Sequence, residues 1–210
     1  MTQQEEEAFV KQAFQALIDR GVAKPEYFTP SPVSDEELAA FEEKYQVVLP
    51  SLLKTFLKSY CYEFYMICAP VPWDPDPDTI QSEEYEMHLL WLELLSVPME
   101  NPLGELAARI ECFREMATGD FIEMEPETVA HLLPVGDYGG AGPLCIDLTL
   151  TEETIDINNM DTWSIQFFDH EEFDWKNSYL EDSGLARGSR EAPDFKTLLE
   201  WYFYGKFDRA

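Results

Sequence analysis

Three aspartates at alternate positions form the clearest cation-binding pattern in the chain. Asp74, Asp76 and Asp78 have the spacing of the first three ligands in an EF-hand calcium loop. The rest of that loop is missing, because Thr79 stands where glycine is needed and a tyrosine stands where the bidentate glutamate is needed. We therefore predict an exposed acidic loop that contacts a partner, with Trp73 as an interface anchor. The alternative is an ordinary surface turn with Trp73 packed against the core.

Two other clusters resemble sites but lack the surroundings that their chemistry requires. His170, Glu171, Glu172 and Asp174 could ligate a metal, but neighbouring residues of a strand point to opposite faces, so we predict a polar strand end. The glycine-rich run 139–142 resembles a phosphate-binding loop, which needs a following lysine and a helix N-terminus. A strand-like Pro-Leu-Cys-Ile follows instead. We predict no metal, no nucleotide or other cofactor, and no enzyme activity.

The negative charge of the chain is concentrated in its middle. The net charge is −28, from 14 Lys and Arg against 42 Asp and Glu. Residues 59–175 hold 2 basic and 26 acidic residues, whereas residues 1–58 carry a net −4 and residues 176–210 are neutral. Such a surface repels nucleic acids and anionic membranes and complements a basic protein. A surface that serves only solubility is the alternative, but solubility needs no such concentration.

Composition also indicates the compartment. The sequence contains no run of about 18 apolar residues, so no transmembrane helix is predicted. The acidic N-terminus does not resemble a signal peptide. We therefore expect a cytoplasmic protein with reduced cysteines. Each cysteine has apolar or aromatic neighbours, so all four are predicted to be buried. They are Cys61, Cys68, Cys112 and Cys145. The sequence does not indicate the oligomeric state.

Apolar spacing predicts helices through most of the first half. A capping box of Ser34 and Glu37 opens one of them, and Leu49-Pro50 separates it from the next, which is expected to start at Pro50. The predicted elements are a helix over 5–20, a proline-containing arm over 22–33, helices over 34–46 and 50–60, a strand over 62–72, a helix over 102–118 and a helical turn over 126–131. Residues 84–96 fit either a helix or a strand.

The second half has the pattern of a β-sheet. The predicted elements are strands over 132–135 and 143–148 around the glycine-rich loop, further strands over 154–157 and 163–168, a polar loop over 176–192 and a final helix over 193–205. Helices, then strands, then a closing helix predict an α+β fold with a central antiparallel or mixed sheet flanked by helices. We divide the chain into an N-terminal helix and arm, 1–33, and a single domain, 34–210.

Three blocks of the sequence, the third made of two segments, contain motifs in an order known from a protein family. Ser34–Leu57 contains a helix, Leu-Pro and a second helix, and Leu133–Asp147 contains a strand, a glycine turn and a strand with an acidic end. Ile165–Glu171 and Asp194–Leu199 supply a last strand and a closing helix. Together they resemble the SUKH superfamily, the SMI/KNR-like proteins. The positions that match its fold-defining residues are Phe41, Glu42, Leu49, Pro50, Asp147 and Phe195. The chain lacks the family's Asn-Gly-like turn, and segments 5–20 and 73–102 are additions.

The resemblance implies the SUKH fold and a non-catalytic binding function. Bacterial members are typically immunity proteins that neutralise a cognate toxin, often a nuclease. We therefore predict an acidic immunity protein that occludes a basic toxin. The predicted contact residues are Trp73, Asp74, Asp76, Asp78, Asp137 and Tyr138. Two alternatives stay open: a scaffold or regulatory protein of the same fold without a toxin, and a small-molecule-binding or hydrolytic domain with a cleft beside the sheet.

Overall fold

The computed structural model describes residues 1–63, 69–72, 89–120, 122–170 and 183–205. Predictions for Trp73, Asp74, Asp76, Asp78 and Cys68 therefore lie outside the described residues. The helices are α1 (Gln3–Asp19), α2 (Asp35–Tyr45), α3 (Ser51–Ser59), α4 (Gly104–Thr118), α5 (Pro126–Val129) and α7 (Phe195–Tyr204), with 3-10 turns η1 (Pro25–Tyr27) and η4 (Met160–Thr162). The strands are β1 (Thr29–Pro30), β2 (Tyr60–Cys61), β3 (Ala69–Pro72), β4 (Leu89–Leu94), β5 (Leu132–Tyr138), β6 (Pro143–Asp147), β7 (Ile165–Phe167) and β8 (Ser189–Ala192).

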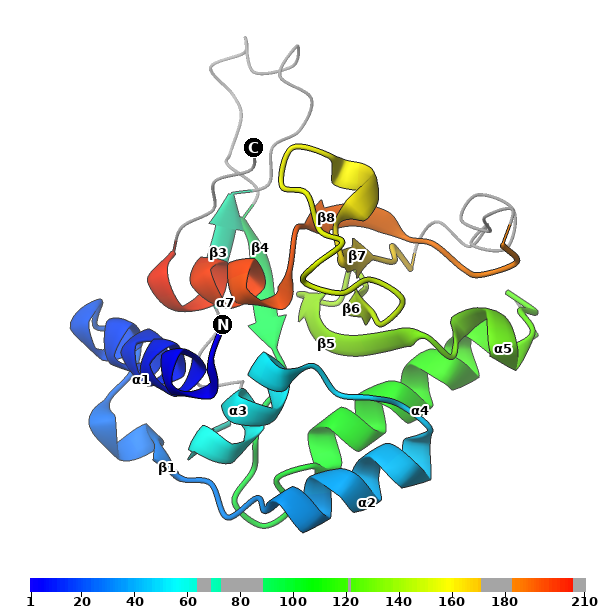
Figure 1. Cartoon of the computed structure of the whole chain (residues 1–210). Helices are drawn as coiled ribbons and strands as arrows, with labels where there is room; N and C mark the ends of the chain where they lie inside the picture. The colour runs from blue at the N-terminus through cyan, green and yellow to red at the C-terminus, as the bar shows by residue number, and fades with distance from the viewer. Residues whose placement is uncertain (64–68, 73–88, 121, 171–182, 206–210) are drawn as a thin grey trace, which may run out of the picture.

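The strands form one large sheet and one small one. The large sheet has the order β3-β4-β5-β6-β7-β8, and every neighbouring pair is antiparallel. The small sheet pairs β1 with β2. The predicted α+β class is confirmed, and the described part of the sheet is antiparallel. Figure 1 shows α1, α3 and α7 side by side, with α4 running toward α5 beneath β5.

Helices cover both faces of the large sheet. Side chains alternate along β6, so Leu144 and Ile146 join the larger core cluster, which includes residues of α1, α3 and α7. Cys145 points the other way, into a smaller cluster with Phe113 and Ala117 of α4. We call the second side the α4 face of the sheet.

The N-terminal helix is part of the larger core. Phe14 of α1 lies with its ring centroid 4.9 Å from that of Phe28, 5.8 Å from Phe56 and 4.8 Å from Phe203. Such aromatic pairs add to the stabilisation from apolar burial. The helix that was expected to belong to an N-terminal extension therefore shares its core with α3 and α7.

Local signals explain the turn between α2 and α3. The Ser34 hydroxyl accepts a hydrogen bond from the Glu37 amide at 3.2 Å, and the Glu37 carboxylate accepts one from the Ser34 amide at 2.8 Å, which is the predicted capping box. Glu42 then accepts a hydrogen bond from the Leu49 amide at 2.7 Å. Pro50 is the N-cap of α3 rather than its first residue, a shift of one position from the prediction.

Two predictions in the second half are wrong, one of a strand and one of a loop. Residues 154–157 form turns, because short polar side chains bond to the local backbone: Thr162 Oγ1 accepts from the Asp156 amide at 2.7 Å, and Asp156 Oδ1 accepts from the Asn158 amide at 3.0 Å. Residues 189–192, expected to be loop, form β8 beside β7.

The cysteine prediction holds for two of the three described cysteines. Cys61 and Cys145 are buried, and burial raises the pKa of both thiols. Cys112 is exposed on α4, which contradicts the expectation of burial. Its helical position explains this, because Phe113, the next residue, occupies the buried side of the helix.

Candidate partner-binding surface

A groove on the α4 face brings two carboxylates together. Asp137 of β5 is paired directly with Glu93 of β4. Both line a groove of about 370 Å³ whose other wall is α4, including Glu105, Arg109 and Cys112. The alternation of side chains along the two strands places both carboxylates on the same face.

The glycine-rich turn holds Asp137 in this position. Its Oδ1 accepts a hydrogen bond from the Gly140 amide at 2.6 Å. Gly139 and Gly140 have φ angles of 56° and 85°, which glycine adopts without steric cost. The run that resembles a phosphate-binding loop is therefore a hairpin turn between β5 and β6.

The ionised forms of the two groove carboxylates are destabilised in the free protein. Partial burial raises the pKa of the Asp137 carboxyl, despite the Gly140 hydrogen bond and the nearby charge of Arg109. Burial and the charge of Asp137 raise the pKa of the Glu93 carboxyl. Arg109 also donates a hydrogen bond to Glu105 at 2.9 Å, so its charge is shared among three carboxylates. An added cation would lower the electrostatic cost of this arrangement.

Six further exposed carboxylates occur along α4, in α5 and between the two helices, and one of them, Glu111, is paired with Lys44 at 3.8 Å. They are Glu111, Glu115, Asp120, Glu123, Glu125 and Glu127. The two arginines of α4 are only partly exposed. Arg114 donates a hydrogen bond to the Tyr45 carbonyl at 3.1 Å, and partial burial lowers its pKa. We call these six carboxylates, together with Glu93 and Asp137, the acidic face.

The second predicted contact residue on this hairpin is placed differently. Tyr138 is only 2% exposed, and its ring stacks edge-on against Phe167 with centroids 5.3 Å apart. Its hydroxyl donates a hydrogen bond to Glu191 at 2.7 Å. The expectation that Tyr138 is an exposed contact residue is corrected here, because the residue after Asp137 in a strand points to the opposite face.

The residues matched to fold-defining positions lie in the framework. Phe41, Leu49 and Phe195 are buried in the larger core. Asp147, also buried, ends β6 and accepts hydrogen bonds from Gln166 at 2.7 Å and Arg190 at 3.3 Å. These positions hold α2, α3, α7 and the sheet together.

Comparison with known proteins agrees with this arrangement. The profile of the SMI1 / KNR4 family (SUKH-1) matches residues 32–201. The chain belongs to the SMI1 / KNR4 family. The match begins near the capping box of α2 and ends within α7, so it includes every framework residue described above. No curated protein sequence matches the chain.

Within this SMI1 / KNR4 domain, sequence reasoning found Asp137 and missed its partner. Glu93 lies in the stretch whose secondary structure was left open, and only the strand register places it opposite Asp137. Across the described residues, no three His, Cys, Asp or Glu side chains form a possible metal-binding group. None of the helices in the same residues is long and apolar enough to cross a bilayer.

The Asp137 carboxylate is expected to lower the stability of this SMI1 / KNR4 domain at neutral pH. Because its pKa is raised in the folded state above the ordinary 3.8, the stability it contributes is present at low pH and lost as the pH rises through the folded-state pKa. Asp137→Asn keeps the Oδ1 acceptor and removes the charge. The variant should have a higher free energy of unfolding than the wild type at pH 7, and urea unfolding should show the difference shrinking toward pH 4.

The matched control is Glu115→Gln, a charge removal at an exposed position of α4. It should change the free energy of unfolding by no more than about 0.5 kcal/mol at either pH. An Asp137→Asn variant less stable than the wild type at pH 7 would show that the Asp137 charge is stabilising in the groove.

Proposed function

We propose that this chain is an immunity protein that binds a basic toxin, with a nuclease as the simplest case, and blocks its active surface without catalysis. The observation that carries the proposal is the acidic face, made up of a carboxylate pair in a groove and six exposed carboxylates of α4, α5 and the segment between them. Membership of the SMI1 / KNR4 family supports a protein-binding role.

The physical basis is substitution of protein carboxylates for phosphates. A nuclease must present Lys and Arg where it holds the phosphates of its substrate. Carboxylates can occupy the same groups, and Arg–carboxylate pairs are strong when both hydrogen bonds of the guanidinium fork form. Complementary charge also raises the rate of association, so a free toxin is captured quickly.

Asp137 and Glu93 have a particular place in this proposal. In the free protein burial raises the pKa of both carboxyls, and the charge of Asp137 raises that of Glu93 further. A Lys or Arg side chain in the groove would lower the electrostatic cost of the two ionised carboxylates. Binding would therefore be most favourable for a partner that places a cation between β4 and α4.

The first experiment is coexpression with the protein encoded immediately upstream, whose C-terminal domain is the candidate toxin. The wild-type chain should restore growth. The triple variant Glu115→Lys, Asp120→Lys, Glu125→Lys should bind the toxin about 100-fold more weakly in a purified binding assay, because it reverses charge at the acidic face. Binding by the wild type should weaken steeply with added salt.

A control with the same change in net charge separates position from total charge. Glu7→Lys, Asp19→Lys, Glu26→Lys alters exposed residues of α1 and the following turn. It should retain growth rescue and most of the affinity. Equal losses in both triple variants would rule out a defined acidic face. A harmless neighbouring protein, or toxicity that this chain leaves untouched, would favour a scaffold without a toxin.

The loop with Asp74, Asp76 and Asp78 is a further candidate contact. Its residues lie outside the described part of the chain, so their role stays a prediction from sequence. Reversing all three to lysine should weaken capture if the loop contacts the toxin. Unchanged affinity would remove this loop from the proposed binding surface.

A further inference from the structure

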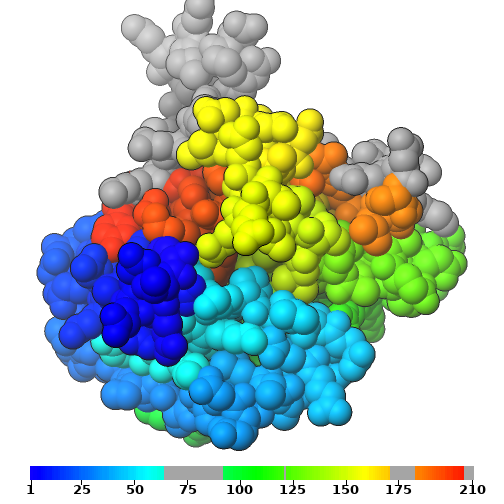
Figure 2. All heavy atoms as spheres, viewed as in Figure 1, coloured from blue at the N-terminus to red at the C-terminus, as the bar shows by residue number. Residues whose placement is uncertain are grey.

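A second concave surface lies on the side of the sheet opposite the acidic face. It is a cleft of about 360 Å³ between the Leu49-Pro50 turn, the loop after β6 and the start of α7. Ile146 of β6 lines it, and Ile146 points away from the α4 face. Figure 2 shows the hollow where the N-terminal helix, the segment around residue 50 and the loop around residue 152 adjoin.

The wall of this cleft is mainly apolar. Its apolar side chains come from four separate parts of the chain. They are Met1, Val48, Leu49, Pro50, Leu52, Ile146, Leu148, Leu150, Ile155 and Phe195. The cleft is larger than the cavity of about 150 Å³ that accepts a benzene-sized group, so it has room for a large apolar side chain.

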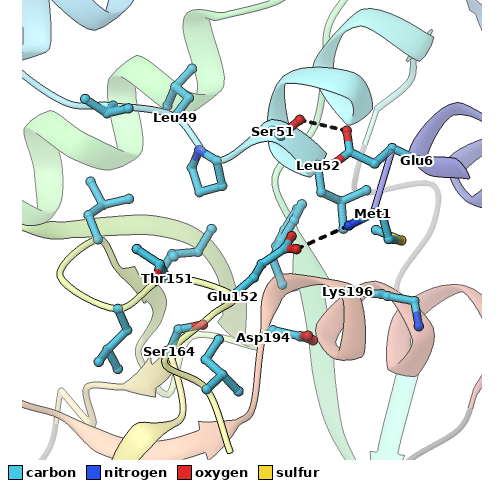
Figure 3. A pocket seen from close by; sticks show the side chains of 17 residues that line it. Met1, Glu6, Leu49, Ser51, Leu52, Thr151, Glu152, Ser164, Asp194 and Lys196 are labelled. Atoms are coloured by element: carbon cyan, nitrogen blue, oxygen red, sulfur yellow. Dashed lines mark hydrogen bonds and ion pairs between the residues drawn. The ribbon is translucent and has the colours of Figure 1, made fainter. Parts of the chain in front are cut away.

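Most polar groups in the wall are already engaged within the protein. Figure 3 shows Glu6 directed at Ser51, and its Oε2 accepts hydrogen bonds from Ser51 and Thr55, each at 2.9 Å. The Ser164 hydroxyl donates to a backbone carbonyl at 3.1 Å. Asp194 Oδ1 accepts from the backbone and hydroxyl of the α7 residue three positions on, at 2.7 Å each. Because these polar groups are hydrogen-bonded within the protein, the interior of the cleft is suited to an apolar group.

The loop that forms part of the cleft wall is acidic, and the lysine of the wall, Lys196, is paired with Glu200 at 3.1 Å. The loop 148–163 contains Glu152, Glu153, Asp156 and Asp161 and no Lys or Arg. All four of these residues are exposed. Glu152 Oε2 pairs with the amino group of Met1 at 3.4 Å, so a cation of the partner would compete with this exposed ion pair (Figure 3).

Exposed apolar side chains occur in the cleft wall and farther along the loop 148–163. Val48, which lines the cleft, is 77% exposed, and Ile157 and Met160 of the loop are 63% and 54% exposed. An apolar centre with a charged rim is the usual anatomy of a protein interface. A small-molecule site more often has convergent polar groups in its interior to orient the ligand.

We propose that the cleft receives an apolar side chain of the partner protein, flanked by Lys or Arg residues that pair with Glu152 and Glu153. The inference rests on the proposed function, since the partner is the same basic protein. It adds a second contact on the far side of the sheet from the acidic face. The apolar anchor would supply specificity that charge alone does not give.

The test uses defined peptides and nuclear magnetic resonance, and it does not require the toxin. The ¹⁵N-labelled chain is titrated with the blocked peptide acetyl-Lys-Leu-Lys-amide. Saturable shifts are expected at the amides of Leu148, Leu150 and Ile155, with a Kd of the order of millimolar, corresponding to about −4 kcal/mol. Acetyl-Lys-Ser-Lys-amide lacks the apolar side chain and acetyl-Glu-Leu-Glu-amide lacks the cations. Each should therefore bind at least about fivefold more weakly.

Two tryptophan variants locate the site. Ile155→Trp fills the cleft and should abolish the shifts at Leu148 and Leu150. Met99→Trp adds the same side chain at an exposed position that neither lines the cleft nor belongs to the loop 148–163, and should bind like the wild type. If Ile155→Trp fails to fold, Glu152→Gln with Glu153→Gln should weaken the Lys-Leu-Lys peptide while leaving acetyl-leucinamide unaffected.

Three results would overturn the inference. They are an absence of shifts at the cleft, binding indifferent to the Ile155→Trp substitution, and binding of neutral 1-hexanol as tight as that of the cationic peptide. The last result would make the cleft a small-molecule site. The toxin-capture assay with acidic-face variants is independent, so a failed peptide titration leaves the proposed function standing.

Discussion

Replacing Asp147 with alanine is expected to lower the free energy of unfolding by about 3–5 kcal/mol, as is usual when one partner of a buried ion pair is removed. The Asp147 side chain is 7% exposed and that of Arg190 is 9% exposed. Asp147 Oδ2 accepts hydrogen bonds from Gln166 at 2.7 Å and Arg190 at 3.3 Å. Its Oδ1 accepts the backbone amide of Thr149 at 3.0 Å and the hydroxyl at 2.5 Å.

The size of the effect follows from where these partners lie. Asp147 ends β6, Gln166 is in β7 and Arg190 is in β8, so one carboxylate joins three consecutive strands. Gln166 extends the network, because its Oε1 accepts the Gly188 amide at 2.6 Å. Alanine would remove the buried acceptor that Gln166, Arg190 and Thr149 now share. Urea unfolding followed by circular dichroism measures the loss.

Two further variants keep the prediction testable if the alanine variant does not fold. Asp147→Asn preserves the shape but loses the charge, and should cost less than alanine while remaining destabilising by more than about 1 kcal/mol. Asp147→Leu combined with Arg190→Met removes the pair and should recover part of the loss, since apolar replacement of both partners is often tolerated. A loss below about 1 kcal/mol in Asp147→Ala would show that the network does not stabilise the sheet.

Features encoded by neighbouring residues were predictable from the sequence. The capping box of Ser34 and Glu37 and the break at Leu49-Pro50 act within a few residues, so their patterns indicate the structure directly. The apolar stripe of the last helix is equally local, and α7 forms within the predicted range. The glycine-rich hairpin was also predictable, since its φ angles require glycine.

Features that depend on pairing between distant segments were not predictable from the sequence. The Ser-Arg-Glu-Ala sequence of β8 has no strand pattern; the strand forms because Arg190 reaches Asp147, 43 positions earlier, and because β7 offers an unpaired edge. Residues 154–157 have β-branched residues typical of a strand, yet Asp156 and Thr162 bond to the local backbone instead.

The candidate site also has one part that the sequence predicts and one part that depends on the pairing of distant strands. The concentration of charge in residues 59–175 predicted an acidic surface, because exposed carboxylates are the default wherever no partner is present. The groove required the register that pairs Glu93 with Asp137, which composition does not contain. Tyr138 shows the same limit, since a shift of one residue along β5 moves a side chain from the groove to the opposite face.

Gly142→Ala is expected to destabilise the protein by more than about 3 kcal/mol, beyond the 1–3 kcal/mol of backbone strain alone. Gly142 has a φ angle of 149°, which L residues rarely adopt. A Cβ atom there would lie 2.0 Å from the carbonyl oxygen of Phe168, which belongs to the backbone. That backbone is fixed on both sides, because the Phe168 amide donates to the Pro143 carbonyl at 3.1 Å and the His170 amide donates to the Ala141 carbonyl at 2.9 Å.

Gly140→Ala is the matched control in the same turn. Gly140 also has a positive φ angle, 85°, but a Cβ atom there meets nothing within 4 Å. It should therefore cost only the left-handed backbone term of about 1–2 kcal/mol. Thermal and urea unfolding of the two variants separate steric overlap from backbone strain. Equal losses of stability in both variants would mean that the backbone around Phe168 shifts readily to accommodate the added Cβ atom. A larger loss in Gly142→Ala would show that steric overlap with the Phe168 backbone, and not backbone strain alone, makes glycine necessary at this position.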